Sequence, residues 1–309
     1  MNGKKIVFLG TPQISAFVLE GLVRNGFNVV SVVTKEDKVR SRGNKVEESD
    51  VAKTARILGI PCHKPHRINK EHDFLQEEKP DLLLTFAYGQ ILSEEVLGLG
   101  TLRPLNLHAS LLPKYRGAAP IQYALRNGDT TTGVTLMEMV KEMDAGDIYA
   151  QESLGIDPED DYTSLSNRLA ALALDMAVKY LPLYFDGKLQ GRKQVESEAT
   201  FCPTIKKEEE KLSLTQSPEA FVNAVRSLSQ EPGGHLLLDE EPIKIFKARK
   251  VSDEKLAPAG TVLLARKKEI HLQLSEGIVA LLELQRPGKK RLSAVDFNNG
   301  SHIEGKTFR

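Results

Sequence analysis

The chain has 309 residues, 40% of them apolar and 27% charged, with a formal net charge of zero at pH 7. This fits an ordinary globular protein of one large or two smaller domains and gives no general sign of nucleic-acid binding. Two cysteines are too few for a disulfide framework, no apolar run approaches the ~20 residues of a membrane span, and no signal peptide is recognised, so a cytoplasmic protein with no membrane partner is expected.

The first part of the chain alternates short apolar runs with segments of helical spacing. Continuous apolar strands that alternate with helices are typical of an α/β fold whose parallel sheet is covered on both faces. The strands are expected at 6–9, 29–33, 81–85, 105–108, 132–138 and 148–156. The helices are expected at 14–24, 51–58 and 165–184.

From about residue 190 the pattern changes. Residues 194–211 are polar, charged and aperiodic, which suits a linker, and 218–228 predicts one further helix. Short strand-like runs separated by Gly, Pro and charged turns then follow, as in a small β-barrel or sandwich. These runs lie at 235–238, 243–247, 260–265, 269–274 and 278–284.

The run at 105–108 carries the most informative side chains. Asn106 and His108 are two residues apart, so both project from one face of a strand. Ligands of open α/β sheets bind at the carboxyl ends of strands, where an amide donor beside an imidazole suits an electrophile. Asp144, in a turn between later strands, is a third candidate. The structural alternatives are a strand-ending Asn, a hydrogen-bonded core His and an Asx turn.

Two other sites are disfavoured. A dinucleotide fingerprint in the first strand-turn-helix needs Gly at three positions, where this chain has Gly10, Pro12 and Ser15, and Pro12 also removes a backbone donor. The cysteine and three histidines between residues 62 and 72 match no standard zinc spacing. A tight turn and a solvated loop are therefore expected at these places, with no metal site.

A long polar loop at 34–50 holds several basic side chains, among them Lys38, Arg40, Arg42 and Lys45. Loops of this length are usually functional or disordered. The residues leave two interpretations open, a solvated loop or a flexible basic finger for a phosphate-rich partner.

Three stretches together resemble one family. They are Asn-Leu-His-Ala-Ser-Leu-Leu-Pro at 106–113, Arg-Gly-Ala-Ala-Pro-Ile-Gln at 116–122, and Gly-Val-Thr at 133–135 with Met-Asp-Ala-Gly-Asp at 143–147. The sequence is similar to the folate-dependent formyltransferases over nearly its whole length, with the likeness weakening after residue 190. The family has Pro near positions 36 and 39, where this chain has Glu36 and Val39, and the chain has no Trp.

The resemblance implies a domain organisation and a site. A catalytic domain of modified Rossmann type is expected at 1–189, a linker at 190–207 and an OB-like β-barrel at 208–309. Asn106, His108 and Asp144 fall on the family's catalytic positions. The folate-contacting turn matches Ser110, Leu111, Leu112 and Pro113, and the loop whose backbone meets the pterin matches Phe86, Ala87, Tyr88, Gly89 and Gln90.

The resemblance also implies a reaction. The formyl group of 10-formyltetrahydrofolate would pass to the α-amine of methionine esterified to initiator tRNA, without a metal. Arg42 falls on the loop arginine associated with the tRNA acceptor end. The basic residues expected beside it on tRNA are Lys38, Arg40, Lys45, Lys247, Lys250, Lys267 and Lys289.

Other readings remain open at this point. The same core in related enzymes formylates purine precursors or amino-sugars. A non-enzymatic RNA-binding protein and a Rossmann dehydrogenase are the alternatives from other classes. A monomer is expected, because no exposed apolar stripe stands out.

Overall fold

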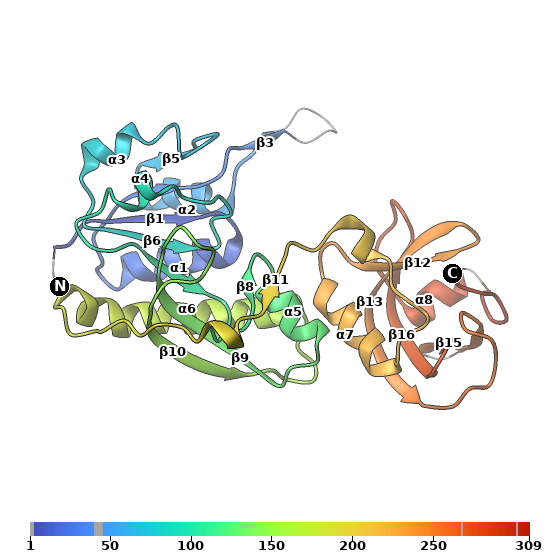
Figure 1. Ribbon diagram of the computed structural model, residues 1–309. Coiled ribbons are helices and arrows are strands. Elements are labelled where there is room, and N and C mark those ends of the chain that lie inside the picture. Colours follow the sequence, from blue (N-terminus) through green and yellow to red (C-terminus); the bar gives the residue numbers. More distant parts are fainter. Residues whose placement is uncertain (1–2, 40–45, 267, 301) are drawn as a thin grey trace. The chain divides into compact units, whose positions relative to one another are not determined.

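The computed structural model describes residues 3–39, 46–266, 268–300 and 302–309, which form two compact units (Figure 1). The first unit is built from Met1–Pro120, Thr131–Gly155 and Ser166–Cys202. The second is built from Ile121–Thr130, Ile156–Leu165 and Pro203–Arg309. Two short internal segments therefore belong with the C-terminal part of the chain.

A seven-stranded sheet forms the centre of the first unit. Its strand order is β10-β9-β7-β6-β1-β2-β5. The five strands from β7 to β5 are parallel, as expected, while β9 is antiparallel to both β7 and β10. The bounds are β1 Ile6–Gly10, β2 Val29–Val33, β5 Cys62–His63, β6 Leu82–Phe86, β7 Leu105–His108, β9 Thr131–Glu138 and β10 Ile148–Gly155.

Helices cover both faces of this sheet, which is why β1 and β6 are buried along their whole length. On one face, α3 and α4 share an apolar cluster with Val7, Leu9 and Leu83. Elsewhere α1 and α6 approach so closely that a Cβ on Gly21 would lie 2.2 Å from Leu174 Cδ2. The bounds of these helices are α1 Gln13–Arg24, α2 Asp50–Leu58, α3 Asp73–Glu78, α4 Glu94–Leu97 and α6 Tyr162–Phe185. Helix α5 (Pro120–Arg126) lies, apart from its first residue, in a segment of the second unit.

The long 34–50 loop is partly a β-ribbon. Strand β3 (Lys38–Val39) pairs antiparallel with β4 (Val46–Glu47). The base of the loop is closed by a 2.7 Å hydrogen bond between the hydroxyls of Thr34 and Ser49. Ser49 also caps α2 by accepting from Ala52 N. The loop therefore leaves and rejoins the unit at a fixed point.

The segment after α6 is structured within the first unit. It contains the 3₁₀ helix η1 (Glu196–Glu198) and the short strand β11 (Phe201–Cys202). Strand β11 pairs in parallel with β8 (Arg116–Gly117). Residues up to 202 thus fold with the sheet, and the 3₁₀ helix η2 (Lys207–Glu210) follows in the second unit.

The second unit is an antiparallel sheet packed on two helices. Strands follow the order β12-β13-β16-β15-β14, with β17 paired to β16. Residues after α8 complete a ring, because Arg309 exchanges backbone hydrogen bonds with Leu237 of β12 while Phe308 N donates to Gly260 O, just before β14. The bounds are α7 Pro218–Leu228, β12 Gly234–Leu238, β13 Glu241–Ser252, β14 Val262–Arg266, β15 Glu269–Leu274, β16 Gly277–Gln285, β17 Leu292–Ser293 and α8 Ala294–Asn299.

The core of this unit lies inside the ring. Phe221 of α7, Phe297 of α8 and Phe308 are fully buried in one apolar cluster with the inward residues of the strands. In the parts of the chain that the structure describes, no helix is long and apolar enough to cross a membrane.

Candidate active site

Asn106 lies on β7, opposite Thr85 of the neighbouring parallel strand β6. The Thr85 hydroxyl donates a 2.7 Å hydrogen bond to Asn106 Oδ1. Because the amide oxygen is engaged, the amide nitrogen is the end that faces away, and within the described residues it makes no hydrogen bond. The local geometry therefore offers an oriented N–H donor near the carboxyl end of β7.

His108 projects from the same face of β7 and is only 5% exposed. Its Nε2 lies 2.8 Å from the carbonyl oxygen of Tyr115. A carbonyl can only accept, so Nε2 carries a proton and donates. The other ring nitrogen, Nδ1, lies 3.7 Å from Oδ2 of Asp144. The structure thus brings His108 and Asp144, two of the three expected catalytic residues, together, and Nδ1 is the ring nitrogen that makes no hydrogen bond among the described residues.

Asp144 is held in a tight turn between β9 and β10. Its backbone has a φ of 51°, in the left-handed region that Asp tolerates better than most residues. The N–H of Gly117 donates a 2.8 Å hydrogen bond to Asp144 Oδ2. Gly146 must be glycine here, since a Cβ would lie 2.1 Å from Glu138 O. The carboxylate therefore has a fixed direction toward His108.

The turn at 110–113 is fixed by side chains from β9 and β10. Thr135 Oγ1 donates to Ser110 O over 2.6 Å and accepts from Leu112 N over 3.1 Å. Gln151 Nε2 donates to Leu112 O and to Thr135 Oγ1, over 2.8 and 2.9 Å. Ser110 Oγ donates to Lys114 O over 2.6 Å. The turn directly follows His108, so its backbone is held rigid next to the imidazole.

The loop at 86–90 exposes backbone and buries side chains. Phe86 and Tyr88 are buried, whereas Ala87 and Gly89 are exposed and both have positive φ, 50° and 82°. Burial raises the pKa of the Tyr88 phenol well above its ordinary value. The first turn after β1 supports this loop, since Thr11 Oγ1 donates to Tyr88 O over 2.9 Å. A ligand here would meet main-chain atoms.

Several supporting residues were not singled out from the sequence. Thr85 and Gln151 show no local motif. Gln194, in the stretch expected as a linker, donates from Nε2 to Asp144 O and Gly146 O over 2.7 and 2.8 Å. Only their position in the fold reveals them, because the residues they hold lie far away in the sequence.

The cysteine and histidines of the 62–72 stretch have separate partners. His63 bonds to Glu78 over 2.9 Å and stacks on Phe74, while His66 bonds to Glu36 over 2.7 Å. His72 Nδ1 lies 3.1 Å from Ile68 O. No group of three or more potential metal ligands occurs among the described residues.

The basic residues expected on tRNA are spread over both units. Arg40, Arg42, Lys45 and Lys267 lie outside the described residues, and Lys38 is on β3. Two others are in ion pairs, Lys247 with Glu159 over 3.1 Å and Lys250 with Asp253 over 2.6 Å. Lys289 is exposed in the turn after β16.

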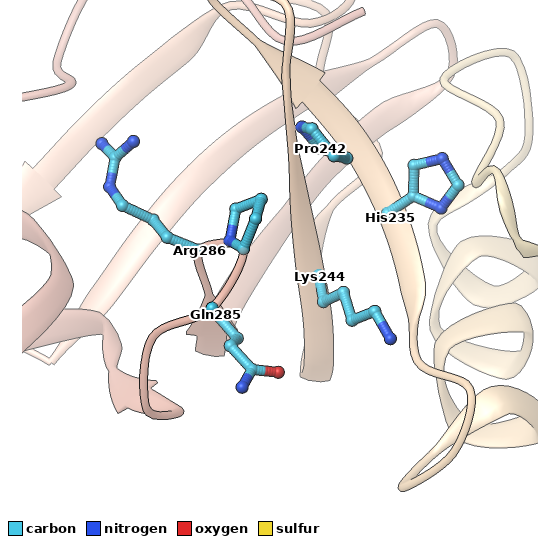
Figure 2. Close-up of a pocket in the computed structure, with 7 residues that line it drawn as sticks. His235, Pro242, Lys244, Gln285 and Arg286 are labelled. Carbon is cyan, nitrogen blue, oxygen red and sulfur yellow. The ribbon is translucent and has the colours of Figure 1, made fainter. Parts of the chain in front are cut away.

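A pocket of about 330 Å³ opens on the sheet of the second unit (Figure 2). Its polar lining comes from His235 on β12, Lys244 on β13, and Gln285 and Arg286 at the end of β16. Arg286 also lies over the ring of Phe297, at 5.1 Å from its centroid. The pocket thus combines the cationic side chains of Lys244 and Arg286 with the turn at Pro287 and Gly288 that follows β16.

Comparison with known families accounts for both units. The family description "Formyl transferase" matches residues 4–181, and "Formyl transferase, C-terminal domain" matches residues 204–302. The chain therefore belongs to the formyl transferase family.

Curated relatives place it more narrowly. A methionyl-tRNA formyltransferase of Lactobacillus gasseri is 40% identical over 297 residues, covering 96% of this chain and 95% of the relative. One of Thermotoga maritima is 38% identical over 307 residues, covering 98% of each. Within the formyl transferases, the chain is a member of the group of methionyl-tRNA formyltransferases.

Solved structures share the fold at low identity. HypX from Aquifex aeolicus, in complex with tetrahydrofolic acid, has a TM-score of 0.68 at 19% identity, covering 100% of this chain and 51% of HypX. WlaRD, a sugar 3N-formyl transferase, also has a TM-score of 0.68 at 19% identity, covering 94% of this chain and 100% of WlaRD. The chain thus shares its fold with these two proteins, one of which is a sugar formyl transferase.

Proposed function

We propose that this chain transfers the formyl group of 10-formyltetrahydrofolate to the α-amino group of methionine on initiator tRNA, and so acts in translation initiation in the cytoplasm. The observation that carries the proposal is the pairing of His108 with Asp144 at the end of β7, on the strand face that also carries Asn106 and next to the 110–113 turn. Relatives at about 40% identity that carry the name methionyl-tRNA formyltransferase support the acceptor.

The chemistry is an acyl transfer. The amine nitrogen attacks the formyl carbon, and a tetrahedral oxyanion forms. The bond from this carbon to the folate nitrogen then breaks, the folate nitrogen gains a proton, and the amine loses one. The protein must stabilise the oxyanion and move these protons.

Asn106 and His108 supply the groups for both tasks. The Asn106 amide N–H donates to the oxyanion, and a donor of this kind contributes about 3–4 kcal/mol in other oxyanion holes. When the His108 ring is protonated, its Nδ1–H becomes a second donor, since Nε2–H stays on Tyr115 O. The Asp144 carboxylate, 3.7 Å from Nδ1, balances that positive charge and receives the amine proton, directly or through water.

The folate donor is placed by main-chain atoms. The backbone of the 86–90 loop, exposed at Ala87 and Gly89, meets the pterin ring, and the Ser110–Pro113 turn lies along the donor next to His108. In support, a formyltransferase-fold neighbour was solved with tetrahydrofolic acid. The donors and acceptors on the edge of a pterin ring can form hydrogen bonds with the N–H and C=O groups of such a backbone-lined site.

The tRNA contact involves basic side chains of both units. Arg42 with Lys38, Arg40 and Lys45 would contact the acceptor end. On the second unit, Lys247, Lys250, Lys267 and Lys289 would follow the phosphate backbone, together with the cationic groups of the pocket in Figure 2. Binding by a monomer should weaken steeply as salt rises, because phosphate contacts release counterions.

One assay tests the proposal. The protein is incubated with 10-formyltetrahydrofolate and one acceptor at a time: methionyl initiator tRNA, free methionine, glycinamide ribonucleotide or a nucleotide-linked amino-sugar. Formylation of the charged tRNA alone is the expected result. Preferred formylation of glycinamide ribonucleotide or of the amino-sugar would establish the alternative, a formyltransferase for a purine precursor or an amino-sugar.

The variant Asn106→Asp tests the catalytic role of Asn106. It keeps the size of the side chain but removes the N–H donor, so kcat should fall by about 100-fold or more, as when an oxyanion donor is lost. The dissociation constant for tRNA should stay unchanged. Equal losses in tRNA binding and turnover would contradict the catalytic role of Asn106.

A further inference from the structure

Residues 192–202 form a segment of the first unit that is anchored at both ends, to strand β10 of the large sheet and to the separate two-stranded sheet β8-β11. Arg192 and Ile148 of β10 exchange backbone hydrogen bonds of 2.8 and 2.9 Å. At the other end β11 pairs with β8, and Ala118 N donates to Cys202 O over 2.9 Å. Between these anchors the segment is free to approach the turn that carries Asp144.

Gln194 makes that approach. Its Nε2 donates to Asp144 O over 2.7 Å and to Gly146 O over 2.8 Å. Its Oε1 accepts from Arg116 Nε over 3.1 Å. The amide therefore uses both N–H groups on the carbonyls that flank the left-handed turn. A non-glycine residue keeps such a left-handed backbone only where its surroundings offset the strain.

Arg116 orients Gln194. The Arg116 residue is 2% exposed, and its guanidinium forms a bidentate pair with Glu196 at 3.0 and 2.9 Å. Such a planar fork fixes the direction of the remaining Nε–H, which points to Gln194. The neighbouring Gly117 donates its N–H to Asp144 Oδ2. Gly117 thus holds the side chain of Asp144, while Arg116 holds the backbone of Asp144 by way of Gln194.

The same segment holds the second partner of His108. Tyr115 O accepts from His108 Nε2, and the N–H of the same residue donates to Thr200 Oγ1 over 2.9 Å. The Cys202 thiol also approaches Tyr115 O at 3.2 Å. Both groups that face the imidazole are therefore supported by residues 192–202.

We propose that Gln194, oriented by Arg116 and Glu196, is a positioning residue that holds the Asp144 turn in register with His108 during formyl transfer. The proposal rests on the catalytic role given above to Asp144. A misplacement of about 1 Å at a reacting group can cost on the order of 100-fold in rate. Loss of the Gln194 donors should therefore act on turnover and not on substrate binding.

The test uses the full chain with Gln194→Glu, which keeps the shape but replaces both donors by a carboxylate facing two carbonyls. We expect kcat to fall by about 10–100-fold, with the KM for each substrate within about twofold, at a temperature where the variant is fully folded. Gln194→Met, uncharged and of similar size, is the second variant if the first folds poorly. Ser197→Ala is the matched control, because Ser197 is exposed on η1 and should keep full activity.

A double-mutant cycle with Asp144→Asn separates positioning from a general structural defect. If Gln194 acts through Asp144, the double variant loses no more activity than Asp144→Asn alone. Losses that multiply, or a Gln194→Glu protein with normal kcat, would overturn this proposal while leaving the proposed function standing. Full activity in Asp144→Asn would overturn the catalytic role of Asp144 and this proposal together.

Discussion

At the residue scale, the site depends on side chains that fix the direction of other side chains. Asn106 can serve as a donor only if its amide does not turn over, and the Thr85 hydroxyl prevents this by occupying Oδ1. The two residues are paired in register on neighbouring parallel strands, so their side chains lie next to each other. The orientation of one N–H thus comes from a hydroxyl on another strand.

Thr85→Val tests this directly. The valine has the same shape and removes only the hydroxyl, so the amide of Asn106 loses its orientation. Since a neutral hydrogen bond contributes about 1 kcal/mol, kcat should fall about fivefold, with KM for the folate donor nearly constant in steady-state assays. Thr132→Val, at a buried position of β9, is the control. An unchanged kcat in Thr85→Val would mean that Asn106 is oriented by something else.

Part of this arrangement could be predicted from the sequence. The period of a strand is two, so Asn106 and His108 were placed on one face from spacing alone, and the strand is observed at the expected residues. The support of Asp144 could not be predicted in this way. Its partners, Gly117 and Gln194, are 27 and 50 residues away and are brought near only by the pairing of two-residue strands.

At the scale of elements, segments with a clear apolar pattern were predicted from the sequence and two-residue strands were not. Helix α6 and strand β7 lie within a few residues of their expected bounds. The two-residue strands β3, β8 and β11 are too short to show a period. The antiparallel direction of β9 could not be predicted either, because an apolar strand has the same sequence pattern in a parallel and in an antiparallel pair.

The contact of β9 with β10 depends on Gly133. A Cβ there would lie 2.2 Å from Glu152 O and 2.6 Å from Leu111 Cδ2. Gly133→Ala should therefore lower the free energy of unfolding by about 1–3 kcal/mol, as expected for overpacking. It should also raise the KM for the folate donor by displacing Leu111. Gly155→Ala at the end of β10, where a Cβ meets nothing within 4 Å, is the matched control. Equal stability of the two variants in denaturant unfolding would contradict this account.

The 192–202 segment should loosen in acid. A hydrogen bond from Arg116 lowers the pKa of the Glu196 carboxyl below its ordinary value near 4.5. A carboxyl whose pKa is lower in the folded state stabilises the fold above the unfolded pKa, and the contribution is lost as the pH falls through the folded pKa. The difference in melting temperature between the wild type and Glu196→Gln should thus be full above pH ~5.5 and vanish in stronger acid. A difference that is the same at every pH would contradict the ion pair.

At the scale of the whole molecule, the units do not follow the order of the chain. The second unit takes in Ile121–Thr130 and Ile156–Leu165 besides Pro203–Arg309. Arg226 of α7 donates to Asp160 O over 2.6 Å and to Asp157 O over 3.3 Å. The sequence pattern predicts only one boundary, near residue 190. The two short internal segments are not recognised, because their composition is like that of the residues around them.

A fragment of residues 203–309 should therefore be less stable than the same residues in the full chain. It leaves Arg226 without its two carbonyl acceptors and removes the ion pair of Arg126 with Glu209 at 2.9 Å. A hydrogen bond typically contributes about 0.5–1.5 kcal/mol, so denaturant unfolding should show a lower midpoint for the fragment. Hydrogen exchange at the amides of α7 in the full chain gives the reference. Equal protection in both would show that the internal segments contribute nothing.

The ring of the second unit is closed by residues 306–309. Lys306 and Phe308 form backbone hydrogen bonds at or just before β14, and Arg309 forms them with β12. These residues follow every other strand in order of synthesis, so a nascent chain must hold two unpaired sheet edges until they are made. Open edges are the places where strands of other molecules add. Ribosome-bound or prematurely terminated chains are therefore the forms of this protein that most need a chaperone, even though their first unit already has all its strands.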